Sequence, residues 1–346
     1  MLAVIEIEWW HYATFVVAIL GVLALDLGVF HKRAHVVGFK EALGWTLLWF
    51  TLAMLFAGTL VPTLGPKRAQ EFVLGYILEL SLSMDNVFVI ALIFAYFRVP
   101  LELQHRVLFW GILGAFVMRG VMIGLGAALV LRFEWILYVF GAFLLFTGVK
   151  MAFSSEDGVH PEKNPIIRLV RRVFPVTSVF DGQKFFTSLG GGVAMTPLAL
   201  VLVMVETTDL IFAVDSIPAI FGVTKYPFVV FTSNVFAILG LRSLYFFLAG
   251  LIRYFRYLKV GLAFVLVFIG LKMLVDPHTP EAPTGDVALP DVPEPRWFQM
   301  EIPASTSLAV VGGIILMSIL CSIIAARREE RAGLAAKPET ADPKQS

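Results

Sequence analysis

Cysteine and charge are scarce in this sequence. The 346 residues include one cysteine, Cys321, which excludes disulfides within the chain and zinc sites built from cysteines. Charged residues make up 15% of the chain, whereas soluble domains carry about a quarter. Hydrophobic residues make up 58%, and the mean hydropathy is +0.84. This composition argues against a soluble enzyme or a disulfide-stabilised secreted domain, and it indicates an integral membrane protein.

Signatures of several enzyme classes are also missing. The sequence holds no Walker A phosphate loop, no HExxH metalloprotease helix and no serine–histidine arrangement. ATP-driven pumping and intramembrane proteolysis therefore lose support. We expect a protein that is not an enzyme, carries no cofactor and binds no nucleic acid.

Long apolar runs dominate the chain, and about 20 apolar residues in a helix cross the hydrocarbon core of a bilayer. The predicted fold class is an all-α integral membrane protein with nine transmembrane helices in a single domain over residues 1–325. We expect these helices near residues 9–30, 42–62, 71–97, 106–131, 135–153, 193–222, 227–250, 258–275 and 304–325. Residues 154–190 are expected to form a cytoplasmic loop, 276–303 an external Pro-rich loop, and 326–346 a disordered cytoplasmic tail.

Basic residues are divided unevenly between the two sides of the expected membrane. With nine spans, the segments "HKRAHVVGFK" (31–40), "RLVRRVF" (168–174) and "ARREERAG" (326–333) fall on one side. The positive-inside rule then places the N-terminus outside and the C-terminus in the cytoplasm. Lys67 and Arg68 are exceptions to this distribution. The arginines of 168–174 either set the orientation or form a basic patch for lipid or a protein partner.

Two stretches of the chain resemble each other, "ELSLSMDNVFVI" from Glu79 and "DLIFAVDSIPAI" from Asp209. In both, an acid is followed six residues later by an aspartate and then by a small polar residue. Further along, "FTGVKM" (146–151) recurs as "FIGLKM" (268–273). The similarity predicts two three-helix repeats, repeat A at about 71–153 and repeat B at about 193–275. Because each repeat has an odd number of spans, the two copies are inverted, as in many secondary transporters.

Acidic residues inside the expected spans need compensation. Six of them are Asp26, Glu79, Asp85, Glu206, Asp209 and Asp215. Left ionised and unpaired, they would cost about 15–20 kcal/mol on membrane-insertion scales. Arg119 and Arg242, one in each repeat, can offset two of these charges. A bound cation or protons would balance the rest, although buried Asp–Arg pairs that only fix helix packing are an alternative.

The candidate metal ligands come from the two similar stretches. They are Glu79, Asp85, Asn86, Asp209, Asp215 and Ser216, with Glu206 and Asp26 as further candidates. Residues seven apart share a helix face, whereas residues six apart point about 120° from each other. Bringing all six together therefore requires a local break, which Pro218 could supply beside the carbonyl of Val214. Carboxylate, amide and hydroxyl oxygens suit Mg²⁺, Ca²⁺ or Mn²⁺ rather than Zn²⁺ or Cu⁺.

Long matches to one known family strengthen this interpretation. "LELSLSMDNVFVIALIF" (78–94), "TPLALVLVMVETTDLIFAVDSIPAIFGVT" (196–224) and "PFVVFTSNVFAILGLRSLYF" (227–246) closely resemble the TerC family of integral membrane proteins, and "ALDLGVFHK" (24–32) fits too. The resemblance covers roughly residues 9–325. It implies a bacterial inner-membrane protein, tied to tellurium resistance and in several members to Mn²⁺ export. The six candidate ligands match the family's acidic motifs by position.

These observations favour a secondary transporter that exports a divalent cation, with Mn²⁺ as the expected ion. In the expected mechanism the carboxylates chelate the ion, the two repeats rock, and protons compete for the carboxylates at release. One alternative is a membrane scaffold that delivers metal or assembles partners without transport, and another is a Ca²⁺ or Na⁺ exchanger. Transport direction, coupling ion and oligomeric state stay open, as do membrane partner proteins.

Overall fold

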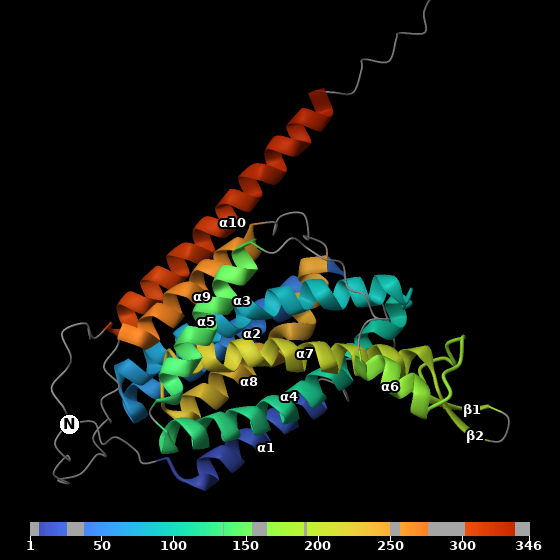
Figure 1. Cartoon of the computed structure of the whole chain (residues 1–346), viewed down its shortest axis with the longest axis horizontal. Coiled ribbons are helices and arrows are strands. Elements are labelled where there is room, and N and C mark those ends of the chain that lie inside the picture. The colour runs from blue at the N-terminus through green and yellow to red at the C-terminus, as the bar shows by residue number, and fades with distance from the viewer. Residues whose placement is uncertain are drawn as a thin grey trace, which may run out of the picture.

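Ten helices and one two-stranded hairpin make up the described part of this computed structural model (Figure 1). The described residues are 7–25, 38–133, 135–153, 165–189, 192–249, 257–275 and 302–335. The elements are α1 (Trp9–Leu25), α2 (Phe39–Leu64), α3 (Pro66–Tyr96), α4 (Leu101–Arg132), α5 (Ile136–Phe153), α6 (Pro165–Val173), β1 (Phe186–Leu189), β2 (Gly192–Met195), α7 (Pro197–Phe221), α8 (Pro227–Ala249), α9 (Leu258–Val275) and α10 (Ala304–Ala335).

Eight of these helices are long and apolar enough to cross a membrane: α2, α3, α4, α5, α7, α8, α9 and α10. The all-α integral membrane fold is therefore confirmed, and these eight helices lie where the apolar runs predicted them. α1 is apolar but has 17 residues, and the rest of its expected span lies outside the described residues. The total of nine spans stays a prediction.

Secondary structure that the apolar runs did not indicate lies in the expected cytoplasmic loop and at the start of the span expected after it. α6 occupies residues 165–173, and β1 pairs with β2 in an antiparallel hairpin. Consequently α7 begins at Pro197 rather than near residue 193. Thr196 fixes this start, because its side chain accepts a hydrogen bond from the backbone N–H of Ala199 and precedes the proline at the first helical position.

Two expectations about helix continuity are wrong. α7 runs without interruption through Pro218 to Phe221, so the expected break beside Val214 is not there. α10 continues to Ala335 and extends past the other helices in Figure 1, so residues 326–335 are helical rather than part of a disordered tail. This part of α10, "ARREERAGLA", is rich in good helix formers, which explains the continuation.

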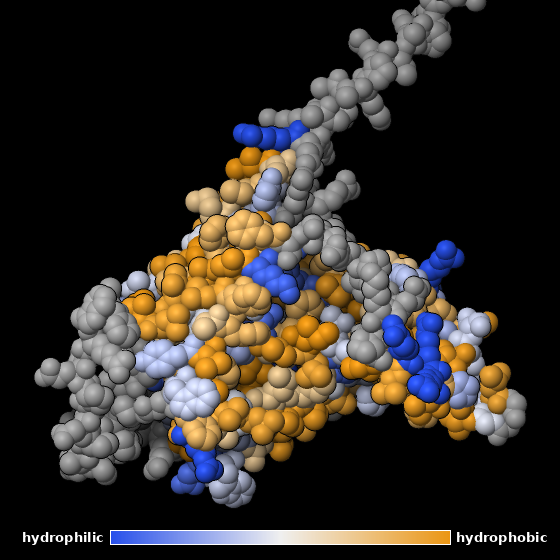
Figure 2. All heavy atoms as spheres, viewed as in Figure 1, coloured by the Kyte–Doolittle hydropathy of each residue, from blue (hydrophilic) through white to orange (hydrophobic). Residues whose placement is uncertain are grey.

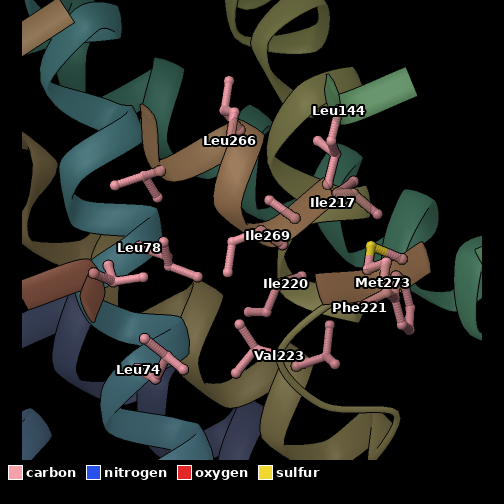
Figure 3. Close-up of a cluster of buried hydrophobic side chains, with 14 of the residues drawn as sticks. Leu74, Leu78, Leu144, Ile217, Ile220, Phe221, Val223, Leu266, Ile269 and Met273 are labelled. Carbon is pink, nitrogen blue, oxygen red and sulfur yellow. The ribbon is translucent and has the colours of Figure 1, made fainter. Parts of the chain in front are cut away.

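The helices of the two expected repeats pack against one another around a shared apolar core (Figure 3). α3 contributes Leu74 and Leu78, α7 contributes Ile217 and Ile220, and α9 contributes Ile269. α3 packs on α7 and α8, while α4 also packs on both of these helices. The core therefore joins the helices that carry the two acidic stretches.

The contact between α5 and α9 is reciprocal. A Cβ atom added at Gly141 would lie 3.0 Å from the carbonyl oxygen of Gly270, and one added at Gly148 would lie 2.9 Å from that of Ala263. Gly148 and Gly270 are the matching glycines of "FTGVKM" and "FIGLKM", and in the same register Gly141 matches Ala263. Gly141 thus contacts Gly270, and the equivalent positions, Ala263 and Gly148, contact each other in the same way. Elements related by a two-fold axis make such paired contacts. This contact supports the predicted inverted repeat.

Arg68, one of the two exceptions to the charge distribution, belongs to a polar cluster at the start of α3. Its Nη1 atom lies 2.8 Å from Oε2 of Glu71, and its guanidinium lies over the ring of Tyr226 at 4.8 Å from the centroid. Glu71 is buried and also accepts a hydrogen bond of 2.6 Å from Thr224. Arg68 therefore neutralises a buried acid, which gives it a structural reason to lie there.

Candidate functional site

Arg119 of α4 lies at the centre of a buried polar cluster between the two acidic stretches. Its side chain is 2% exposed. The guanidinium donates from Nη2 to Oδ1 of Asp209 over 2.8 Å and from Nε to Oδ2 over 3.1 Å, which is a bidentate pair. Nη1 also forms an ion pair with Oε1 of Glu79. One cation thus joins an acid of α3 to an acid of α7.

Three further polar side chains complete this cluster, which we call the Arg119 cluster. Asn86 of α3 donates from Nδ2 to Oδ1 of Asp209 over 3.1 Å. Ser216 of α7 accepts from Nη1 of Arg119 over 3.4 Å, and Ser83 donates to Oε1 of Glu79 over 3.5 Å. The cluster therefore contains Ser83, Glu79, Asn86, Arg119, Asp209 and Ser216. All six side chains belong to buried residues.

Helix periodicity and the antiparallel crossing of α3 and α7 explain this convergence. Glu79 and Asn86 are seven residues apart on α3, as are Asp209 and Ser216 on α7, so each pair shares one helix face. A Cβ added at Gly75 would lie 3.1 Å from Ile220, while Asn86 contacts Asp209. The two faces therefore meet with opposite chain directions, and the four side chains surround the guanidinium.

The Arg119 cluster has an excess of negative charge and an orphaned oxygen. With Glu79 and Asp209 ionised, one guanidinium balances two carboxylates, and the remaining charge lies away from water. Within the described part of the chain, Oδ1 of Asn86 is buried and has no hydrogen-bond partner, because the amide nitrogen is the group directed at Asp209. Buried polar groups are normally satisfied, so a cation, a proton or a bound molecule would fit beside these oxygens.

Glu206 lies one turn before Asp209 on α7 and packs directly against α4. A Cβ added at Gly114 would lie 2.6 Å from Oε2 of Glu206 and closer still to Oε1. The carboxyl group therefore occupies the space that a larger residue at position 114 would fill. Oε2 is buried, and no described residue forms a hydrogen bond with it. Glu206 thus places a second orphaned oxygen between α4 and α7, the two helices that also supply Arg119 and Asp209.

The structure does not gather the other candidate ligands into one metal centre. Asp215 is half-buried, accepts a side-chain hydrogen bond from Thr147 of α5 and interacts electrostatically with Lys150. Because α7 is continuous, Asp215 points about 120° from Asp209 and toward α5. Asp85 and Arg242 are half-buried on α3 and α8. Among the described residues, no three His, Cys, Asp or Glu side chains are close enough to hold a metal ion. Asp26 lies outside the described residues.

Some residues of interest carried little signal in the sequence. Gly114 stands among other glycines of an apolar span, and its contact with Glu206 depends on how α4 packs on α7. Asn234 of α8 is fully buried, and neither the nitrogen nor the oxygen of its amide has a hydrogen-bond partner among the residues that the structure describes. Its polar neighbours in "TSN" were a usable signal, since amides are rare in the middle of membrane spans.

Comparison with known proteins agrees with this architecture. The family described as "Integral membrane protein TerC family" matches residues 64–331. The "Uncharacterized membrane protein STKORF319" of Myxococcus xanthus is 48% identical over 316 residues, which cover 91% of this chain and 92% of that protein. The "Putative membrane-bound redox modulator Alx" of Escherichia coli (strain K12) is 46% identical over 315 residues, which cover 88% of this chain and 92% of that protein.

A more distant relative extends the same pattern. An "Uncharacterized membrane protein" of Rickettsia bellii (strain RML369-C) is 37% identical over 310 residues, which cover 90% of this chain and 96% of that protein. No solved structure matches the chain significantly. Since the family match spans most of the chain and includes both acidic stretches and every helix of the Arg119 cluster, the chain belongs to the TerC family of integral membrane proteins.

Proposed function

We propose that this chain is a secondary transporter that exports a divalent metal cation, with Mn²⁺ as the expected ion, across the cytoplasmic membrane. One observation carries the proposal. Glu79 and Asp209 come from two similar stretches on antiparallel helices, and both bind one buried guanidinium, that of Arg119. Substrate sites of inverted-repeat transporters lie at the same kind of interface between the two repeats.

Arg119 has the role of an internal counter-ion in this proposal. The guanidinium keeps its charge at any physiological pH, so it can neutralise the two carboxylates whenever no metal is bound. A divalent cation entering the site competes with Arg119 for the same oxygens. The side-chain oxygens of Glu79, Asp209, Asn86 and Ser216 are hard ligands, which are the type that Mn²⁺, Mg²⁺ and Ca²⁺ prefer. Metal binding then requires Arg119 to release at least one carboxylate.

This exchange gives a reason for alternating access. α3 and α7 belong to different repeats, so moving one repeat against the other separates Glu79 from Asp209. Separation breaks the site on one side and lets Arg119 replace the metal on the carboxylates. Protons on the outer side compete for the same carboxylates and promote release of the ion. The direction of transport, out of the cytoplasm, is part of the proposal.

The name of the Escherichia coli relative raises a redox role, which we find less well supported by this chain. Reversible formation of a disulfide within one chain needs two cysteines, and this sequence has only Cys321, which is exposed on α10. The buried acids, by contrast, are repeated in both motifs and contact each other through Arg119. A metal-transport function therefore accounts for more of the structure.

Manganese flux in proteoliposomes tests the proposal. We expect Glu79→Gln and Asp209→Asn each to abolish flux while the protein still purifies as a folded membrane protein. Glu71→Gln is the matched control, because Glu71 is an equally buried, arginine-paired acid of α3 that lies outside the Arg119 cluster. Wild-type flux in both cluster variants would refute the proposal. Competition by Ca²⁺ or Na⁺ in the same assay distinguishes an exchanger for those ions.

A further inference from the structure

We propose that α6 and the hairpin that follows it form a binding surface for the headgroups of anionic phospholipids, at the end of the bundle where α7 begins. In Figure 1 these elements lie together beyond the start of α7, and Figure 2 shows strongly hydrophilic residues beside hydrophobic ones in the same area. The inference depends on the membrane location of the family and not on metal transport. Its failure and the failure of the proposed function are therefore separate results.

The sequence of α6, "PIIRLVRRV", separates charge from apolar side chains around the helix. At 100° per residue, Arg168, Arg171 and Arg172 fall within one arc of about 100°. The apolar residues fill the rest of the circumference. Such a segregated basic and apolar helix is typical of segments that lie in a membrane interface.

Only part of the apolar face is used by the protein itself. Ile167 is 1% exposed and packs in the core that α7 shares, which anchors α6 to the bundle. Leu169 and Val173, on the side of the helix next to Arg172, are 60% and 61% exposed. In a loop surrounded by water, these exposed apolar side chains would not contribute to stability. Beside a bilayer, they can enter the boundary between headgroups and acyl chains while the arginines remain among the phosphates.

The hairpin presents a second apolar surface of the same kind and is held in place. Phe186, Leu189 and Val193 are all more than half exposed on β1 and β2. Arg106 of α4 donates to Oε1 of Gln183 over 3.0 Å and lies over the ring of Phe185, so the hairpin is attached to a membrane-spanning helix. A fixed pair of amphipathic elements therefore extends from the bundle.

Charge complementarity identifies the occupant as an anionic lipid. Guanidinium groups bind phosphate oxygens through paired hydrogen bonds, and the predicted orientation places α6 at the anionic cytoplasmic leaflet. Asp181 does not neutralise the arginines, because it accepts hydrogen bonds from Lys184 over 3.2 Å and from Thr187 over 2.7 Å. The position beside α7 also matters, since a lipid bound there would restrain the helix that carries Asp209.

Hydrogen exchange of the full-length chain in lipid nanodiscs tests this inference. We expect amide exchange in residues 166–173 to slow by roughly tenfold to a hundredfold when phosphatidylglycerol replaces part of a phosphatidylcholine bilayer, given the attraction that each basic residue contributes. Neutralising the arginines in R168Q/R171Q/R172Q should remove this difference. The variant L169S/V173S should reduce it, because insertion of the apolar side chains is lost.

Two controls decide between the sources of the effect. The matched variant R327Q/R328Q/R331Q removes three arginines from the end of α10 and should leave the lipid-dependent protection of α6 intact. Inorganic phosphate added to phosphatidylcholine discs should have no effect. Equal exchange in the two bilayers overturns the proposal. Protection of α6 that inorganic phosphate reproduces would also overturn the proposal, as would protection that appears only when a soluble protein is added.

Discussion

Asn86 donates a hydrogen bond to Asp209 over 3.1 Å, which connects the end of one acidic stretch to the start of the other. Asn86 is the last polar residue of the α3 stretch, and Asp209 is the first of the α7 stretch. In an antiparallel pair of equivalent helices, such contacts should occur in reciprocal sets. The corresponding partner contact, between Glu79 and Ser216, is bridged by Arg119. The arginine thus makes the two halves of the cluster unequal.

Removing the positive charge of Arg119 should destabilise the protein. Arg119→Gln leaves the carboxylates of Glu79 and Asp209 buried without their cation, and breaking a buried ion pair costs about 3–5 kcal/mol. We expect a lower midpoint of thermal unfolding for the variant in detergent than for the wild type.

The triple variant R119Q/E79Q/D209N provides the control for this prediction. It has no unpaired buried charge, so we expect it to be more stable than Arg119→Gln alone. If the triple variant unfolded at the same temperature as Arg119→Gln, or at a lower one, the two unpaired buried carboxylates would not be the cause of the destabilisation. If the oxygens of the cluster are the ligands, Mn²⁺ should stabilise Arg119→Gln, which keeps both carboxylates, and should not stabilise the triple variant.

The helix positions could be predicted from sequence because they depend on local hydrophobicity. An apolar run of about 20 residues is long enough to cross a bilayer as a helix. Eight such runs form helices at the expected positions. The hairpin at 186–195 was not predictable in this way, since its short strands carry no long apolar run. The continuation of α7 through Pro218 was missed for a different reason. A proline inside a membrane helix is tolerated when neighbouring helices pack around it, and that packing is not visible in the sequence.

The composition of the Arg119 cluster was only partly predictable. Heptad spacing on one helix placed Glu79 with Asn86 and Asp209 with Ser216, because that depends only on helix geometry. Which arginine balances the acids depends on how α4 packs, and the count of charges alone left both Arg119 and Arg242 as candidates. The position of Asp215 beside Thr147 likewise depends on the packing of α5 on α7.

Enlarging the equivalent glycines of α5 and α9 should show whether the two positions contribute equally to the stability of the protein. Gly148→Val and Gly270→Val, at equivalent positions, each place a side chain against the backbone of the other helix, where added Cβ atoms would lie 2.9 Å from the carbonyl oxygen of Ala263 and 2.7 Å from that of Gly141. We expect both to destabilise the protein, by about 1–3 kcal/mol, because the backbone cannot yield as a side chain does. Thermal unfolding in detergent measures the effect. Gly58→Val on α2 is the control and should be neutral, because a Cβ added at Gly58 has no atom of the described residues within 4 Å.

Acidification should loosen the hairpin before it affects the helices. Hydrogen bonds from Thr187 and Lys184 hold the pKa of Asp181 below its usual value. A carboxyl whose pKa is lowered by folding stabilises the folded state above the pKa of the unfolded chain. That contribution is lost as the pH falls through the lowered pKa of the folded state. We expect hydrogen exchange of residues 186–195 to accelerate at acidic pH in the wild type. Asp181→Asn should remove the pH dependence, and an unchanged profile in that variant would contradict the assignment.

Gly114→Ala should separate transport from stability. The added methyl group meets the carboxyl end of Glu206, which is the flexible end of a side chain and can move without displacing backbone. We therefore expect normal thermal stability but a changed rate of Mn²⁺ flux, because the orphaned carboxylate between α4 and α7 is displaced. Gly124→Ala is the matched control on the same helix, since a Cβ at Gly124 meets no atom of the described chain segments within 4 Å. If Gly114→Ala and Gly124→Ala transport Mn²⁺ equally well, Glu206 has no part in the path of the ion. If Gly114→Ala lowers flux and Glu206→Gln lowers it equally, with no further loss in the double variant, both act through the same carboxyl group.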